Sequence, residues 1–160
     1  MSLAGIDFED PILGFDLGST TGWGCLEGNV YRAGEQHFRK ETRLSDLRKW
    51  VYEIVEATRP ALIAIEQPFI NLRPSTMAIL HMHGVVLERL QGCMAPHIMI
   101  GNTEAKRHIG GHGGMTAEDK KNGAMVRALS KLGFVVSSTD AADGLAVALC
   151  ARRRIFGRLT

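Results

Sequence analysis

Four carboxylates occupy positions where apolar segments of the chain begin or end. Asp16 closes the segment ILGFD and Glu66 closes ALIAIE, whereas Asp140 and Asp143 open the segment TDAADGLAVALC. An isolated ionised carboxylate is costly to remove from water, so such positions call for a compensating positive charge. Oxygen ligands gathered from strand ends and a helix start suit Mg²⁺ or Mn²⁺, and these ions catalyse phosphoryl chemistry. The four acids therefore predict a divalent-metal site.

The segments before and between these acids predict the strands of a sheet. Apolar stretches separated by turn signals are typical of three antiparallel strands over 12–16, 22–27 and 30–38. The short apolar segments 61–66 and 97–100 are typical of strands buried on both faces. Asp16 and Glu66 would then end two adjacent central strands.

Periodic apolar residues predict the helices. We expect them over 42–58, 74–91 and 102–108, from Thr116 onward, and from Thr139 or Asp140 into the C-terminal segment. Four glycines in seven residues predict a mobile loop over 109–115. The order of elements indicates a mixed sheet flanked by helices, in an α/β or α+β fold.

The last helix can bring two acids to the same place as the strand ends. Asp140 and Asp143 are three residues apart, so they project on neighbouring helix faces with a rise of about 4.5 Å between them. Two strand ends and one helix start can therefore converge on a single metal cluster.

Length and composition indicate one cytoplasmic domain. The chain has 160 residues, of which 45% are hydrophobic and 22% charged, and it contains no run of eighteen apolar residues. The first eleven residues carry three acids and no basic residue, so we expect no signal peptide and no membrane partner. We divide the chain into an extension (1–11), a domain (12–156) and a tail (157–160).

The three cysteines and the basic residues say less about the function than the four acids do. Cys25, Cys93 and Cys150 are widely spaced within apolar segments, and this placement predicts thiols in the core. The three cysteines lack the paired spacing that is typical of a zinc site. The net charge is only +2, although basic residues gather over 39–49, 106–108, 120–121 and 151–158. These clusters are compatible with a polyanionic partner, and equally with solvated helix faces and a basic tail.

Four motifs together resemble one known family. They are ILGFDLGSTTGWG, IAIEQPF, NTEAKRHIGGHGGMTAEDKKNGAMVRALSKLG and TDAADGLAVALC. They resemble, in family order and over 12–150, the RuvC-type Holliday junction resolvases, which are crossover junction endodeoxyribonucleases of the ribonuclease H-like superfamily. The resemblance implies a ribonuclease H-like fold with a mixed five-stranded sheet.

The resemblance also implies an activity. A homodimer would bind four-way or branched DNA and nick two opposed strands symmetrically, leaving a 5′ phosphate and a 3′ hydroxyl. Asp16, Glu66, Asp140 and Asp143 would be catalytic and would hold two Mg²⁺ (or Mn²⁺) ions. A branch-migration motor is a further candidate partner.

Other residues would contact the DNA if the resemblance holds. Phe69 would stack on bases at the junction point, although a core position is a rival interpretation. Lys106 matches the first active-site lysine of the family, whereas Lys120 lies one residue after the position expected for the second, where this chain has Asp119. The expected DNA contacts are Phe69, Arg73, Lys106, Arg107 and Lys120, and Lys120 would also be catalytic.

The helix expected over 74–91 has two interpretations. Met77, Leu80, Gly84 and Leu87 fit the dimer contact that the family makes with this helix, and core packing explains them nearly as well. His81 and His83 are two residues apart, so they lie on different sides of a helix and cannot chelate one ion together.

Three rival functions remain open. A sugar kinase or actin-like ATPase shares FDLGSTTGW, but it needs two such domains to enclose a nucleotide. Another ribonuclease H-like nuclease, such as a ribonuclease H or a YqgF-like enzyme, would act on RNA or branched DNA. An inactive junction-binding module would not need all four acids.

Overall fold

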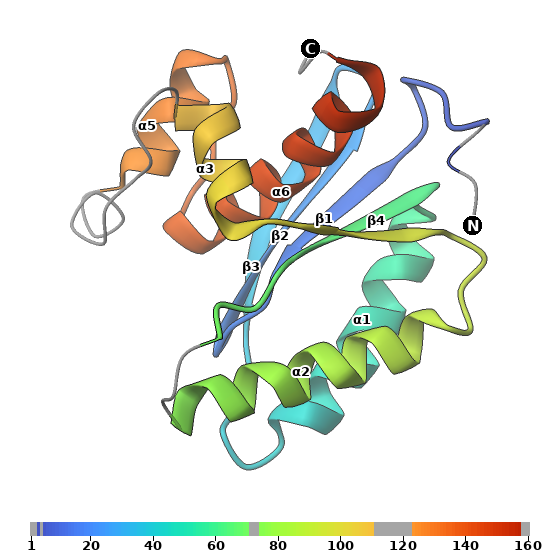
Figure 1. The fold of residues 1–160 in the computed structure, drawn as a ribbon, viewed down its shortest axis with the longest axis vertical. Coiled ribbons are helices and arrows are strands. Elements are labelled where there is room, and N and C mark those ends of the chain that lie inside the picture. The colour runs from blue at the N-terminus through green and yellow to red at the C-terminus, as the bar shows by residue number, and fades with distance from the viewer. Residues whose placement is uncertain (1–2, 4, 71–73, 111–122, 158–160) are drawn as a thin grey trace.

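The computed structural model describes residues 3, 5–70, 74–110 and 123–157, and it contains one mixed sheet with helices on both faces (Figure 1). The strands are β1 (Ile12–Asp16), β2 (Thr20–Glu27), β3 (Val30–His37), β4 (Leu62–Glu66) and β5 (His97–Ile100). The helices are α1 (Arg43–Thr58), α2 (Pro74–Leu90), α3 (Asn102–Gly110), α5 (Ala124–Lys131) and α6 (Thr139–Phe156).

The predicted strands and the helices α1, α2, α3 and α6 are confirmed, with small differences at their ends, whereas the start of α5 at Ala124 was not predicted. Strand β2 begins at Thr20, two residues before the expected start. The prediction that the glycine loop begins at Ile109 is wrong, because α3 continues to Gly110. Ile109 is buried against the core beside α6, and this contact extends the helix. The rest of the predicted loop and the helix start at Thr116 lie outside the described residues.

The sheet has the order β3-β2-β1-β4-β5, which confirms a mixed five-stranded sheet. Strands β1, β2 and β3 are antiparallel neighbours, whereas β4 runs parallel to β1 and β5 runs parallel to β4. The β1–β4 register pairs Phe15 with Ile65, so the next residues along, Asp16 and Glu66, lie side by side. The prediction that these acids end adjacent central strands is confirmed.

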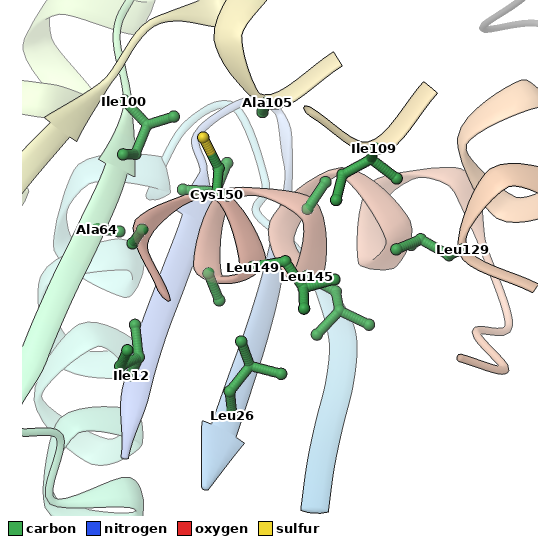
Figure 2. Close-up of a cluster of buried hydrophobic side chains, with 14 of the residues drawn as sticks. Ile12, Leu26, Ala64, Ile100, Ala105, Ile109, Leu129, Leu145, Leu149 and Cys150 are labelled. Carbon is green, nitrogen blue, oxygen red and sulfur yellow. The ribbon is translucent and has the colours of Figure 1, made fainter. Parts of the chain in front are cut away.

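Each face of the sheet carries its own hydrophobic core, because side chains alternate along a strand. Leu13, Phe15 and Ile65 point to the face covered by α1 and α2. Ile12 and Ala64 point to the opposite face, where α6 is the central helix and α3 and α5 pack around it (Figures 1 and 2).

Helix α6 lies unusually close to β1 and β2. A Cβ atom built on Gly24 would lie 2.4 Å from the Cα of Leu145, and one on Gly22 would lie 1.7 Å from the carbonyl oxygen of Asp140. From the helix side, a Cβ atom on Gly144 would lie 2.3 Å from the amide nitrogen of Trp23. Contacts this short leave no space for a side chain, so glycine at these positions sets the distance between helix and sheet.

The two ends of the described chain pack on each other. The rings of Phe8 and Phe156 are 5.7 Å apart, and the guanidinium of Arg152 lies 4.8 Å from the Phe8 ring. Arg152 is only 2% exposed and donates a hydrogen bond to the carbonyl of Gly28. The described part of the basic segment, 151–157, is therefore not simply a solvated tail. Within the described ranges, every helix is too short or too polar to cross a membrane.

We predict that Gly24→Ala lowers the free energy of unfolding by about 3 kcal/mol or more, because overpacking against a backbone that cannot move aside is destabilising. Gly92→Ala is the matched control, since a Cβ atom on Gly92 meets only the carbonyl oxygen of Arg89 at 3.8 Å, an ordinary contact. The control should stay within about 0.5 kcal/mol of wild type. Urea unfolding measures both, and an unchanged midpoint for Gly24→Ala would contradict the close contact.

Candidate active site

Two of the predicted acids line one cavity at the end of the central strands. Asp16 and Glu66 end β1 and β4 and, by strand alternation, point to the face that α6 covers. Asp16 is half-buried and Glu66 is buried. The cavity has a volume of about 150 Å³, and its wall also contains Phe69, His83 and Asn102.

The start of α6 brings the other two acids to the same edge of the sheet. Gly22 pairs with Asp16 across the β1–β2 ladder, and the backbone of Asp140 lies directly against Gly22. Ser138 caps the helix, because its hydroxyl accepts a hydrogen bond of 3.2 Å from the amide of Ala141. Asp140 and the following Asp143 are both half-buried in this first part of the helix.

The four carboxylates do not form a tight cage. One group of three potential metal ligands has ligand atoms that all lie within 4.8 Å of one another among the described residues, and it consists of Glu104, His108 and Cys150. The four acids are instead distributed around the ends of β1 and β4 and the start of α6.

Helix α3 places a predicted lysine near this cavity. The Nζ atom of Lys106 donates a 2.5 Å hydrogen bond to the Oδ1 atom of Asn102, which lines the cavity one turn earlier. Lys106 is half-buried and Arg107 is exposed. Arg73 and Lys120, the other two predicted cationic contacts, lie outside the described residues.

Phe69 is a surface residue. Its side chain is 68% exposed at the rim of the cavity, so the alternative of a core phenylalanine is wrong. The residue follows the end of β4 by three positions, where the chain has left the sheet and neither core covers it.

His83 is a cavity residue that sequence reasoning set aside. His81 is exposed, whereas His83 is 5% exposed, so the prediction that the pair cannot chelate one ion agrees with their placement. The Nδ1 atom of His83 has no hydrogen-bond partner among the described residues. Burial lowers the pKa of His83, and the negative charge of Asp16 opposes this shift. Helical spacing from the buried Val86 and Leu90, three and seven residues later, was the only available signal for its burial.

Comparison with known proteins identifies relatives over nearly the whole chain. A family model described as "Crossover junction endodeoxyribonuclease RuvC" matches residues 5–151. The RuvC protein of Desulforamulus reducens is 30% identical over 150 residues, which cover 87% of this chain and 91% of the relative. That of Ralstonia nicotianae is 33% identical over 150 residues, which cover 87% of this chain and 81% of the relative.

The fold is also similar to a solved structure. T. thermophilus RuvC in complex with Holliday junction substrate superposes with a TM-score of 0.71 at 20% identity, covering 92% of this chain and 96% of that one. At this identity the likeness establishes the fold, which is the predicted ribonuclease H-like one.

We predict that His83 makes the protein less stable as the pH falls below about 6.5. The unfolded chain protonates His83 at its ordinary pKa, whereas the folded chain does so only at lower pH, so acidification favours the unfolded state. The loss is at most about 1.4 kcal/mol for each pH unit. His83→Gln should weaken this pH dependence, and the exposed His81→Gln should leave it unchanged. Equal slopes in urea unfolding between pH 7.5 and 5.5 for wild type and His83→Gln would refute the assignment.

Proposed function

The chain belongs to the RuvC family of crossover junction endodeoxyribonucleases, and on this premise we propose that it resolves four-way DNA junctions by metal-dependent paired nicking. The observation that carries the proposal is the neighbouring position of Asp16 and Glu66 in one cavity, with the start of α6 packed against the strand beside them. The site lies at an open edge of the sheet, where a backbone phosphate can approach it.

The donor set fits hard divalent cations. Asp16, Glu66, Asp140 and Asp143 offer only carboxylate oxygens, which are the ligands that Mg²⁺ and Mn²⁺ prefer. Two such ions held by these four acids would activate the attacking water and stabilise the leaving 3′ oxygen. Asp16 lies between Glu66 on one neighbouring strand and Gly22, against which Asp140 packs, on the other. We assign it the central position among the four acids that would hold the metal.

The other residues of the site would position the DNA. Lys106 has an ammonium group held by Asn102 at the cavity wall, so it is oriented to neutralise a phosphate beside the cut site. Exposed Arg107 would contact the flanking backbone. Phe69 presents an aromatic ring to solvent at the cavity rim, a position suited to stacking on an unpaired base.

A homodimer would supply the two sites that paired nicking needs. Of the four residues predicted for a dimer contact, Leu80 and Leu87 are half-buried, and Leu87 packs against the core under α2. Met77 is 56% exposed and Gly84 is exposed. Core packing therefore does not account for Met77 and Gly84. Their exposure supports the proposal that this side of α2 contacts a second copy.

The decisive substrate test compares a mobile synthetic four-way junction with linear duplex and an RNA–DNA hybrid, in Mg²⁺ or Mn²⁺. We expect symmetric paired nicks with ligatable ends on the junction alone. Cleavage of the hybrid would favour a ribonuclease-like activity of the same fold, and cleavage of none would favour an inactive junction-binding protein.

Asp16→Asn should reduce junction cleavage by about 100-fold or more, because a metal ligand contributes several kcal/mol of transition-state stabilisation. Junction affinity should remain, since the substitution removes negative charge and no DNA contact. Asp46→Asn, at an exposed position on α1, is the matched control and should cleave at the wild-type rate. Gel-based cleavage and binding assays report both properties, and wild-type cleavage by Asp16→Asn would exclude the proposed metal site.

Phe69→Ala should weaken junction binding by about 5- to 150-fold, which corresponds to the 1–3 kcal/mol that stacking on one base contributes. The free energy of unfolding should stay within about 0.5 kcal/mol of wild type, because Phe69 is exposed. Tyr52→Ala provides a matched aromatic control, since Tyr52 is also exposed but lies on α1, away from the cavity. Unchanged junction affinity of Phe69→Ala would show that Phe69 does not stack on the DNA.

A further inference from the structure

A second cluster of potential metal ligands lies where α3 packs on α6. Glu104 and His108 are one turn apart on α3, and Cys150 faces them from α6. The Nδ1 atom of His108 is 3.1 Å from the Sγ atom of Cys150. Cys150 follows Asp143 by seven residues, which is about 10 Å along a helix, so this cluster is separate from the four acids.

We propose that Glu104, His108 and Cys150 form a binding site for a transition-metal ion of the zinc type, distinct from the nuclease metal site. A thiolate, an imidazole and a carboxylate are the ligands that Zn²⁺ and Co²⁺ accept, whereas Mg²⁺ requires oxygen ligands. Tetrahedral zinc places its sulfur and nitrogen ligands about 3.6 Å apart. The observed separation of 3.1 Å needs only a small side-chain movement to reach this geometry.

The fold holds two of the three ligands, Cys150 and Glu104, in place. Cys150 is fully buried, and Figure 2 shows its sulfur on the side of α6 that faces Ile100 and Ala105. The carboxylate of Glu104 accepts a 3.3 Å hydrogen bond from the amide of Gly101 and a 3.2 Å hydrogen bond from the Nε atom of Arg154. Such outer hydrogen bonds orient a metal ligand before the ion binds.

The ligand types of the cluster select for an ion that binds thiolate strongly. Burial raises the pKa of Cys150 to about 12, and the charge of Glu104 adds to this effect while Arg154 opposes it. Without an ion the thiol therefore keeps its proton at neutral pH. Burial would also raise the pKa of Glu104, but the hydrogen bond and charge of Arg154 outweigh it, so that this carboxylate stays ionised. A zinc-type ion deprotonates a coordinating thiol, whereas Mg²⁺ does not compete for sulfur.

An ion at this site would fasten α3 to α6. Helix α3 also carries Asn102, which lines the cavity of Asp16 and Glu66, and Lys106, which donates a hydrogen bond to Asn102. The fourth coordination position would be taken by water, because the three residues supply one ligand atom each. The site would therefore stabilise the helix that positions the proposed phosphate contact.

Cobalt titration of the chelator-treated, untagged full chain tests the proposal. A thiolate bound to Co²⁺ gives a charge-transfer absorption band, which an ion held by the four acids does not give because they contain no sulfur. We expect the band to saturate at one equivalent, to be reversed by Zn²⁺ and to survive a large excess of Mg²⁺. Absence of the band in the wild-type protein at excess Co²⁺ would overturn the proposal.

Three variants identify the ligands. Cys150→Ala should abolish the band, and His108→Gln should weaken Co²⁺ binding by at least about 10-fold. Cys93→Ala replaces the half-exposed cysteine outside the cluster and should leave the absorption band and the affinity for Co²⁺ unchanged. His108 is only half-buried, so its variant keeps the test informative even if Cys150→Ala does not fold. A band that persists in folded Cys150→Ala, or wild-type affinity in His108→Gln, would refute the assigned ligands.

Discussion

The close contact between α6 and the first two strands is the constraint on which the rest of the structure depends. Gly22 and Gly24 on β2 and Gly144 on α6 let the two backbones approach to distances that exclude any side chain. Gly22 is also the ladder partner of Asp16. The contact that fixes the distance between helix and sheet therefore also fixes where the acids of α6 lie relative to the acid of β1. Stability of the fold and geometry of the site depend on the same atoms.

Helix α6 changes its chemical environment along its length. Its first turn carries Asp140 at the open edge of the sheet, its middle is buried on the sheet, and its last turns carry arginines. Those arginines are used within the protein: Arg152 is buried against Phe8, and Arg154 pairs with Glu104. Arg152 is therefore not available to a polyanion, whereas Arg153 and Arg154 are exposed. Helix α3 presents further basic side chains near the cavity that Asp16 and Glu66 line.

Local patterns in the sequence predicted the elements and the composition of the site. Strands and helices have different periods of side-chain direction, so apolar spacing and turn signals located the five strands and the helices α1, α2, α3 and α6 to within about two residues. The start of α5 at Ala124 was not predicted. The adjacency of Asp16 and Glu66 was also predictable, because both end strands that are apolar throughout and such strands occupy the centre of a sheet. Sequence patterns could not give the separation between the carboxylates, which depends on how closely α6 approaches the sheet.

Only the tertiary structure decided which side chains are covered and which distant residues meet. The exposure of Phe69 and the burial of His83 depend on what packs over them, and local patterns give only weak signals of either. The three cysteines lack zinc spacing along the chain, yet His108 and Cys150 meet across 42 residues because α3 lies on α6. The sequence by itself thus determined the secondary structure and the four acids, since both follow from local residue order. The tertiary structure alone decided the cavity and the second cluster, since both arise from contacts between separate elements.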